Sequence, residues 1–585
     1  MCLFFRSARL LFAFAAPYLL ICACFFPKAA FAQKIYSDQK YPLTAFRQPL
    51  DIQPPALAGS FGELRANHLH SGLDFRTNQR TGYPVYAVAD GEVARLRVQN
   101  SGFGLALYIR HADGFTSVYG HLSRFSPKIA RIVKDVQSRQ KSYEIDESPT
   151  EMRLPVKKGE VIAYSGNTGS SGGPHLHFEL RDTKTETTIN AQLLGMQIPD
   201  HVPPVISALY VYRLNGLPFS EFTPKQYFRL SGGAGKYQLY QTPTIHLSGE
   251  VGFGLVTTDR HDGQSGLNGV YAIELEVDGQ VVFTSAVERF NFENSRGINA
   301  HIDYATFQKT KQSIQKSFVD PGNPLQIYSH LVNNGRLRFE DGKLHHLRYT
   351  VSDVAGNKSS LEFNVLADPK AVIPSPKQPD GTLFPFGQAN EFSTSDIKVS
   401  IPKGSLYNDL NFVYKKLARP AQGAFSEQHQ VQDKLTPLHQ GFDLWIKADS
   451  SLIPFQQKAL IVNSSGVSQD GQFENGYVKA HPATFGTFYI AIDTLPPAIS
   501  PVNLTEGIHL NGQAKMSFRI SDKLSGIKSF NGYIDGKWVL MEFDAKTGNL
   551  WHSFDENTAA GKHQFELLVS DRKDNLKRYT LTFYR

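Results

Sequence analysis

Short stretches of alternating hydrophobic and polar residues fill the first third of the chain, from about residue 54 to residue 194. Alternation with a period of two is typical of half-buried β-strands. Residues 84–89 run into Asp90-Gly91, a pair that favours a hairpin turn into the next stretch. The pattern predicts an antiparallel β-domain with strands at residues 84–89, 92–98, 105–110, 115–119 and from 156 onward.

One segment of this region follows a helical period instead. Ile129, Ile132, Val133 and Val136 are three, one and three residues apart, which places them on one face of a helix. We therefore expect one amphipathic helix within residues 126–142, in a domain that is otherwise built of strands.

The other two thirds of the chain contain an internal repeat. Each copy opens with an Asp-x-x-Pro-Pro linker, continues through Ser-Gly, Asn-Gly and Asp-Gly turn signals, and closes with Val-Ser-Asp followed by Asn. Short strands at this spacing are typical of β-sandwiches of immunoglobulin-like build. The matching segments are residues 200–206 with 493–499, 259–279 with 522–536, and 351–357 with 569–575.

The repeat divides the remaining chain into domains. We predict immunoglobulin-like β-domains at residues 200–368 and 493–585. Residues 369–492 form a β-domain of unspecified topology, because residues 397–402 alternate as a strand does. A chain of 585 residues is too long for one hydrophobic core. The predicted fold class is mainly β: an antiparallel N-terminal domain with one inserted helix, followed by about three β-sandwich-type domains.

The first 32 residues have the pattern of an export signal. Arg6 and Arg9 precede an apolar run from Leu10 to Phe26, and Ala30-Phe31-Ala32 offers a small-x-small cleavage site. We expect cleavage there, a lead-in segment at residues 33–53, and an exported protein in the periplasm, in the cell envelope or outside the cell.

The cysteines limit the chemistry of the mature protein. Cys2, Cys22 and Cys24 all lie in the signal, so a cleaved chain has no disulfide, thiol nucleophile or thiolate ligand. Any transition metal must then be held by His, Asp or Glu. A retained membrane anchor and a lipoprotein signal at residues 21–24 are the alternatives to cleavage, and Cys22 fits the lipoprotein pattern poorly. No later stretch is long and apolar enough to span a bilayer.

The charge balance excludes one class of partner. The formal net charge is +7, and the signal's three basic residues leave +4 for the rest of the chain. Basic clusters interleaved with base-stacking aromatics are missing, so we expect no nucleic-acid partner. The sequence leaves the oligomeric state open.

Three short segments concentrate histidine. His70 and Asp74 are four residues apart, and an imidazole nitrogen and a carboxylate oxygen are both good zinc ligands. His121 lies at the end of a predicted strand. His175 and His177 begin a strand after a Gly/Ser-rich loop, so both side chains point to the same face. A metal that keeps imidazole neutral would explain two such side chains next to each other.

Together these segments resemble the lysostaphin- and LytM-like zinc endopeptidases. Order and spacing agree over about residues 60–182, roughly a fifth of the chain. The shared motifs are His-x-x-x-Asp at 70–74, Tyr-Gly-His-Leu at 119–122, and the block from Ser-Gly-Asn-Thr-Gly to Pro-His-Leu-His-Phe-Glu at 165–179.

The resemblance implies a peptidase domain at residues 54–199 with a metal in a groove. It also implies one Zn²⁺ per chain, ligated by His70, Asp74 and His177, with His121 and His175 as the catalytic histidines. Such a ligand set leaves an open fourth position, where a bound water reaches a pKa of about 7. A His-Glu-x-x-His sequence is missing, so the two catalytic histidines must supply proton transfer and stabilisation of the developing charge.

Two features depart from the compact members of that family. Residues 127–153 look inserted, and we expect them to wall or cover the groove. His68 lies two residues before His70 and competes with it as a ligand, but the family pattern favours His70.

The resemblance implies that peptide cross-links of bacterial peptidoglycan are the substrate. One alternative is an endopeptidase for Gly-rich proteins. Another is an inactive relative that activates other wall hydrolases, which predicts a replaced ligand, whereas all five positions are filled. A β-rich surface adhesin with a vestigial head is the third. We interpret the trailing β-domains as spacers or wall-docking modules.

Overall fold

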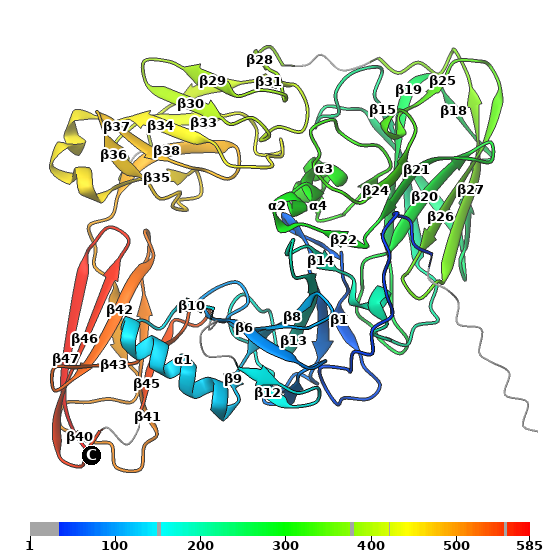
Figure 1. The fold of residues 1–585 in the computed structure, drawn as a ribbon. Helices are drawn as coiled ribbons and strands as arrows, with labels where there is room; N and C mark the ends of the chain where they lie inside the picture. Colours follow the sequence, from blue (N-terminus) through cyan, green and yellow to red (C-terminus); the bar gives the residue numbers. More distant parts are fainter. Residues whose placement is uncertain (1–33, 149–153, 375–378, 421, 555–557) are drawn as a thin grey trace, which may run out of the picture.

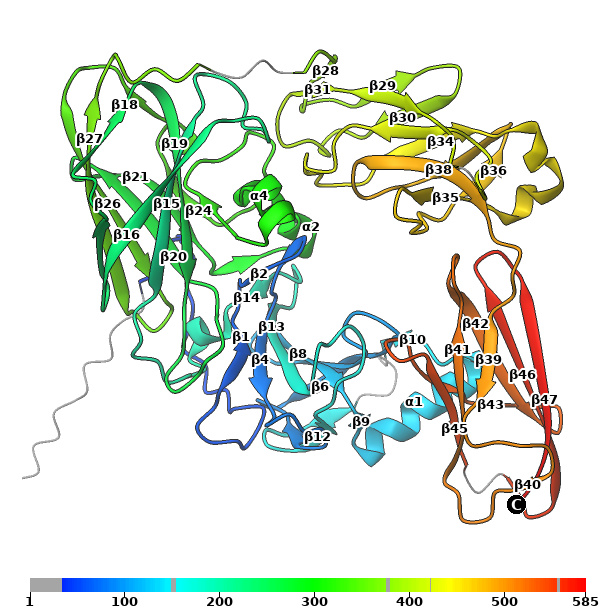
Figure 2. The same cartoon turned by 180° about the vertical axis from the view of Figure 1, so that it is seen from behind.

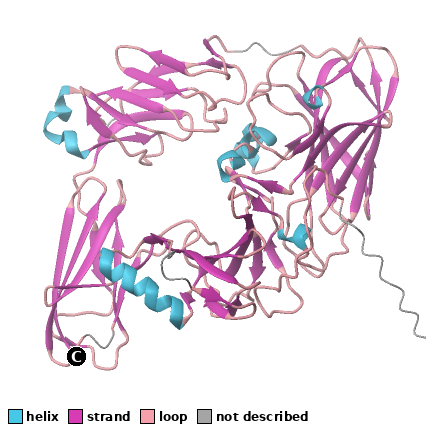
Figure 3. Cartoon of the chain, in the orientation of Figure 1, coloured by secondary structure: helices cyan, strands magenta, loops and turns pink. Residues whose placement is uncertain are grey.

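The computed structural model describes residues 34–148, 154–374, 379–420, 422–554 and 558–585. The predicted export signal lies outside the described residues. Strands dominate the described chain and helices are few, so the fold is mainly β as predicted (Figure 3). Four large hydrophobic clusters follow one another along the chain. The lobes built on them are arranged in a ring, in which the last lobe returns to the first (Figures 1 and 2).

The first lobe is built on a mainly antiparallel sheet of ten strands. Its central strands β4, β13 and β8 carry residues of the candidate site. In spatial order the main path is β1 (Leu57–Gly59), β4 (Leu73–Arg76), β13 (His175–Asp182), β8 (Phe115–Leu122), β7 (Leu105–Arg110), β6 (Gly91–Val98) and β10 (Ile145–Glu147), with β11 (Pro155–Val156), β14 (Thr188–Ile189) and β22 (Arg289–Phe290) off it.

A small sheet of three strands lies beside the main one. It consists of β5 (Pro84–Tyr86), β12 (Val161–Tyr164) and β9 (Arg124–Phe125). The hairpin predicted between residues 84–89 and 92–98 is therefore wrong, because β5 pairs with β12 and β6 pairs with β7. The backbone of Ala87 instead exchanges hydrogen bonds with the 159–160 turn, which takes the partners that a hairpin would have used.

The predicted helix is confirmed as α1 (Pro127–Gln140). Pro127 begins it, where a missing backbone N–H costs nothing, and Lys141 ends it in the left-handed region with φ 47°. Ile129, Val133 and Val136 are buried on its inner face, as their spacing predicts.

The second lobe contains a twelve-stranded, twisted sheet whose central segments β16 and β17 link its two halves. Three short helices, α2 (Phe292–Ser295), α3 (Ile298–His301) and α4 (Tyr304–Thr310), were not predicted, because seven residues or fewer are too short to show a helical period. The strands are β15 (Val205–Arg213), β16 (Lys225–Gly233), β17 (Lys236–Leu239), β18 (Thr244–Leu247), β19 (Gly249–Thr258), β20 (Ala272–Val277), β21 (Gln280–Ala286), β23 (Gln315–Lys316), β24 (Tyr328–Leu331), β25 (Leu337–Phe339), β26 (Leu344–Ser352) and β27 (Lys358–Ala367).

The third lobe packs a five-stranded sheet and a four-stranded sheet around one core. The strand predicted at residues 397–402 is β30 (Ile397–Ile401). It lies in the order β29 (Asn390–Ser393), β30, β34 (Asp443–Lys447), β37 (Tyr477–Ala480), β36 (Gln472–Glu474), facing β32 (Tyr414–Leu417), β33 (Gln428–Val431), β38 (Gly486–Ile492), β35 (Ala459–Asn463), with β28 (Thr382–Phe384) and β31 (Leu410–Phe412) as a separate pair.

The last lobe has the same plan of two packed sheets. The hairpin β44–β45 belongs to its four-stranded sheet and points towards the first lobe (Figure 1). The sheets are β39 (Ala498–Pro501), β41 (Lys515–Ser521), β45 (Asn549–Ser553), β44 (Glu542–Asp544), and β40 (Ile508–His509), β47 (Leu576–Tyr584), β46 (Lys562–Asp571), β42 (Ile527–Ile534), β43 (Lys537–Val539). Within the described parts of the chain, the helices lack the length and apolarity that crossing a membrane requires.

Candidate metal centre and active site

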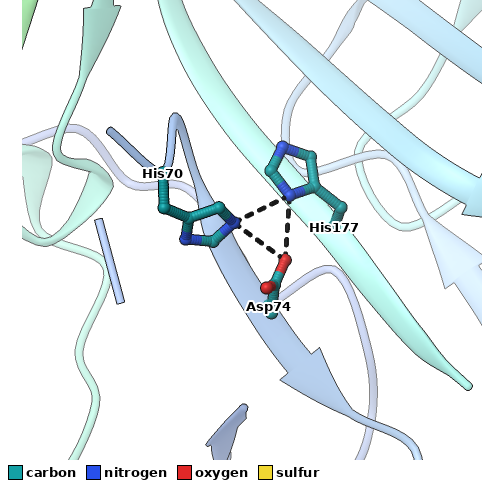
Figure 4. Close-up of side chains that lie close together, drawn as sticks. All are labelled: His70, Asp74 and His177. Atoms are coloured by element: carbon teal, nitrogen blue, oxygen red, sulfur yellow. Dashed lines mark hydrogen bonds and ion pairs between the residues drawn. The ribbon is translucent and has the colours of Figure 1, made fainter. Parts of the chain in front are cut away.

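Two neighbouring strands and one turn bring the three predicted metal ligands together. Strands β4 and β13 are antiparallel, and their register places Asp74 directly opposite His177. His70 comes from the turn between β3 (His68–Leu69) and β4, and its ring points to the same spot (Figure 4). Residues far apart in the sequence therefore meet because of strand pairing.

The three side chains offer one ligand atom each within a narrow space. The Nε2 atom of His70 lies 3.0 Å from Oδ1 of Asp74 and 3.1 Å from Nδ1 of His177. The same Asp74 oxygen lies 2.9 Å from Nδ1 of His177. All three residues are buried. This set of atoms is one of the places in the described residues where a metal ion could be held.

Hydrogen bonds on the far side of each ring fix which nitrogen carries the proton. Nδ1 of His70 is 2.7 Å from the carbonyl oxygen of Ser60, which can only accept, so His70 donates there and keeps a lone pair on Nε2. Nε2 of His177 is 3.0 Å from a carboxylate oxygen of Glu179 and donates to it, so the neutral form of this ring has its lone pair on Nδ1. Both lone pairs face the shared space that a metal would need.

The two predicted catalytic histidines lie beside this space with the same kind of support. The ring centroids of His121 and His175 are 4.8 Å apart. Nδ1 of His121 donates to the carbonyl of Thr168 at 2.9 Å, and Nδ1 of His175 donates to that of Gly173 at 2.8 Å. Each ring therefore keeps a lone pair on Nε2, and Nε2 of His175 lies 3.3 Å from Oδ1 of Asp74.

Two sequence profiles of known protein families match parts of the chain. Residues 68–140 and 145–190 match the sequence profile of peptidase family M23. The chain carries an M23 peptidase domain. Residues 381–493 match a second profile, that of the Zu5-like domain, which covers the third lobe.

The similarity to individual proteins covers only part of the chain. The chain is 38% identical over 118 residues to the DD-carboxypeptidase/endopeptidase Mpg of Neisseria meningitidis, which covers 20% of this chain and 21% of that protein. It is 41% identical over 110 residues to an uncharacterized metalloprotease of Haemophilus influenzae, which covers 19% and 18%. The chain thus matches only about a fifth of the length of these relatives.

A solved structure also matches part of the chain. A point mutant of the catalytic domain of the M23 protein EnpA from Enterococcus faecalis is 25% identical and covers 25% of this chain and 96% of that one, with a TM-score of 0.19.

Charges around the M23 site set the protonation of its groups. Burial alone would lower the pKa of His177, but hydrogen bonds to Asp74 and Glu179 raise it to about 9. Burial and the neighbouring rings of His177 and His175 lower the pKa of His121 to about 3, so His121 is neutral at neutral pH. A metal must displace the proton of His177, so its affinity should rise with pH up to about 9.

Asp74 and Glu179 are held as carboxylates despite their burial. Burial opposes ionisation of Asp74, but the three neighbouring histidines keep its pKa well below the usual range. Burial opposes it for Glu179 as well, but Arg181, His177 and Ser71 lower that pKa to about 2. Asp74 is therefore available as an anionic ligand, and Glu179 as an anionic acceptor.

Close backbone approach explains two glycines of the site. A Cβ at Gly166 would lie 2.3 Å from the backbone nitrogen of Ser123 and 2.5 Å from the carbonyl oxygen of His121. A Cβ at Gly72 would lie 2.3 Å from the carbonyl oxygen of Phe178. Both glycines therefore let two segments meet closely, so that the histidines they neighbour share one space.

The sequence did not indicate several residues that support the histidines. Phe103 stacks on the ring of His177, with centroids 4.9 Å apart and planes 24° apart. Arg65 pairs with the second oxygen of Asp74 at 3.3 Å. Among these supporting residues, only Glu179 could have been found from the sequence, because it is two residues after His177 and shares its strand face.

His68 does not join the ligand set. It is exposed, and its Nδ1 lies 3.0 Å from the carbonyl oxygen of Ala66. It is also not among the residues whose ligand atoms converge with those of His70. The competing ligand that the sequence allowed is thus placed outside the centre.

The last lobe reaches the loop that supports the catalytic histidines. Lys546, at the tip of the β44–β45 hairpin, donates to the carbonyls of Asn167 and Ser171. A cavity of about 450 Å³ lies between the lobes, lined by α1, the 167–169 loop and β44–β45. The inserted segment therefore walls a cavity next to the site together with the last lobe.

Replacing Glu179 with Gln should weaken metal binding. The carboxylate accepts from Nε2 of His177 at 3.0 Å and orients that ring, and partners of this kind are typically worth about 10–100-fold in metal affinity. Titration of the metal-free protein measures this. The control is Glu186→Gln, which removes the exposed second partner of Arg181. Equal affinities of the two variants would contradict this role for Glu179.

Replacing Lys546 with Ala should lower kcat/KM by less than about tenfold and leave metal content unchanged. The variant removes a charged donor from two loop carbonyls and loosens the segment whose Thr168 orients His121. Kinetics with a soluble cross-linked peptide measure the effect. Lys528→Ala, which changes an exposed cation of the same lobe, is the control. A loss of metal in Lys546→Ala would show that the contact has another role.

Proposed function

We propose that this chain is an exported zinc metalloendopeptidase that hydrolyses the peptide cross-links of bacterial peptidoglycan. The observation that carries the proposal is the convergence of five side chains on one space. Three of them present ligand atoms within 3.1 Å of one another, and two imidazoles whose Nδ1 atoms donate to backbone carbonyls lie next to them.

The donor set fits zinc. Two imidazole nitrogens and one carboxylate oxygen are typical zinc ligands, and a three-ligand set is typical of catalytic rather than structural sites. His70, Asp74 and His177 would hold the ion, with Ser60 and Glu179 fixing the two rings. When bound, zinc acidifies a water molecule and polarises the scissile carbonyl.

The remaining residues can handle the proton of the reaction. His121 and His175 present unprotonated Nε2 atoms, because each donates its Nδ1 proton to a fixed carbonyl. A neutral imidazole accepts the proton of the attacking water, and the resulting imidazolium donates it to the leaving amine. Between these two transfers, the imidazolium stabilises the negative charge that develops on the carbonyl oxygen.

The choice of substrate rests on the relatives. The chain is similar to proteins named as DD-carboxypeptidase/endopeptidase and as peptidoglycan DD-endopeptidase. Export is supported by the basic and apolar pattern of the first 32 residues, and the wall is reached only from outside the cytoplasm.

Digestion of purified substrates tests the proposal. Full-length, zinc-loaded protein is incubated with peptidoglycan and, separately, with elastin, and product masses identify the bond cleaved. We expect muropeptides shortened at the cross-link and no elastin fragments. Elastin fragments alone would overturn the wall substrate. No cleavage by the protein itself, with stimulation of another wall hydrolase, would overturn the enzyme in favour of an activator.

A further inference from the structure

A second buried cluster of ligand-type side chains lies in the second lobe, outside the M23 site. Ligand atoms of Asp200, Asp259 and His261 all lie within 4.8 Å of one another. All three residues are buried. Asp200 ends the linker from the M23 domain, and the other two follow strand β19. The cluster thus joins the linker to a loop of the second lobe.

One carboxylate oxygen in this cluster has no partner. Oδ1 of Asp259 is buried and makes no hydrogen bond to any described residue, and Asp259 is only 3% exposed. Leaving an ionised oxygen in this state costs far more free energy than leaving a hydrogen-bonded one there. The position therefore requires either a proton or a cation.

The surroundings add negative rather than positive charge. Asp353 is 3% exposed and acts on Asp259 and Asp200 through its charge. Three carboxyl groups are therefore buried close together, and a bound cation would offset their mutual repulsion.

The imidazole in the cluster is oriented by a buried amide. Nδ2 of Asn268 lies 2.7 Å from Nδ1 of His261 and donates to it, and Nε2 of His261 lies 3.9 Å from Oδ2 of Asp200. The oxygen and nitrogen of an amide are interchangeable by a flip of the group. With the amide oxygen accepting from Nδ1, Nε2 is free to ligate beside the carboxylates.

The internal repeat supplies a natural comparison. In the last lobe Asp493 and Asp522 match Asp200 and Asp259, and they converge with Asp571, which matches Asp353; Leu524 stands where the second lobe has His261. There, backbone N–H groups donate to all three carboxylates, as from Ser525 to Asp493. The partly buried Lys573 adds a cation whose charge interacts with Asp493 and Asp571. In the last lobe, backbone donors and a lysine of the chain itself therefore stabilise the three clustered carboxylates.

We propose that Asp200, Asp259 and His261 bind a divalent transition-metal ion, separate from the M23 site. Two carboxylates and one imidazole form a donor set of the kind that binds such ions, whereas calcium prefers oxygen ligands alone. The ion meets the demand for positive charge that Lys573 meets in the last lobe.

The position of the ion gives it a structural role. The loop that carries Asp259 and His261 also contacts the M23 domain, because Nε of Arg76 donates to Gln264 at 3.3 Å and Ser60 bonds the backbone of Gly269. Arg76 lies two residues after Asp74, and Ser60 supports His70. An ion that ties this loop to the linker holds the second lobe against the edge of the candidate active site.

Metal stoichiometry of the full-length protein tests the inference. The protein is loaded with Zn²⁺, dialysed, and analysed for metal per folded chain. We expect about two zinc ions per chain for the unchanged protein, about one for Asp259→Asn, about one for Asp74→Ala, and about two for the control Asp522→Asn. The Asp74→Ala arm reports the M23 site by itself, so failure of the proposed function is distinguishable from failure of this inference.

Three results would overturn the second site: one zinc ion in the unchanged protein that Asp74→Ala removes, two ions retained in Asp259→Asn, or displacement of the second ion by millimolar Ca²⁺. Circular dichroism checks that each variant is folded. If Asp259→Asn does not fold, His261→Gln replaces it, and the same loss of one ion is expected.

Discussion

Replacing His175 with Ala should reduce peptidoglycan cleavage by about 10²- to 10⁴-fold while leaving the metal bound, because His175 supplies proton transfer and not a ligand atom in the proposed mechanism. Its Nδ1 is fixed by the carbonyl of Gly173, so Nε2 is the atom that is lost from the site. The measurement is the rate of muropeptide release together with zinc content per chain.

A histidine elsewhere in the chain provides the matched control for His175→Ala. His346 lies in the second lobe with about half of its side chain exposed, so His346→Ala should retain both cleavage and metal. If His175→Ala lost the metal along with activity, His175 would be a ligand and its assignment to proton transfer would be wrong. Retained cleavage would leave His121 as the single base.

Sequence pattern was sufficient for the local elements of the M23 domain. The helix at α1 followed from the spacing of apolar residues that now face the core, and the alternating stretches became strands β6, β7 and β8. The prediction of a hairpin at Asp90-Gly91 was wrong because a turn signal describes only local geometry. The backbone of Ala87 instead makes hydrogen bonds with the 159–160 turn, which is distant in sequence.

The candidate site residues were named from a family resemblance that short motifs carry, and the residue pattern by itself predicted only that two histidines share a strand face. His175 and His177 share a strand face by simple alternation, and the structure brings both to the same space. What supports them was not visible, since Phe103 and the carbonyl of Ser60 reach the rings of the site through loop packing. Such contacts depend on long-range pairing, which no local pattern encodes.

The internal repeat is a second case in which a sequence pattern predicted local turns but not the contacts between distant residues. Its matching Asp positions suggested turns, and each set does lie at the end of a linker or a strand. Their convergence into clusters came only with the packing of the sheets. The difference between the two copies, one with Lys573 and one with an unpartnered oxygen on Asp259, also depends on that packing.

Replacing Asp74 with Ala should remove the metal from the M23 site and abolish cleavage. Oδ1 of Asp74 lies within 3.3 Å of nitrogen atoms of three histidines, and it is the single negative charge among the proposed ligands. Without it, two neutral imidazoles must hold a divalent ion alone. The affinity loss should exceed the roughly 10–100-fold expected for Glu179→Gln, because Asp74 is proposed as a direct ligand and Glu179 only as a partner of one. Zinc titration and muropeptide release measure both effects.

The control for this variant must remove a carboxylate without touching the site. Asp113 lies in the exposed turn before β8, so Asp113→Asn should keep metal and activity.

Excess zinc separates two explanations of an inactive Asp74→Ala protein. If millimolar zinc restored cleavage to the unchanged level, the carboxylate would only raise affinity. We expect no such recovery, because Oδ1 of Asp74 also lies 3.3 Å from Nε2 of His175, where it stabilises the imidazolium that forms during proton transfer. Losing this carboxylate therefore disturbs metal binding and proton transfer together.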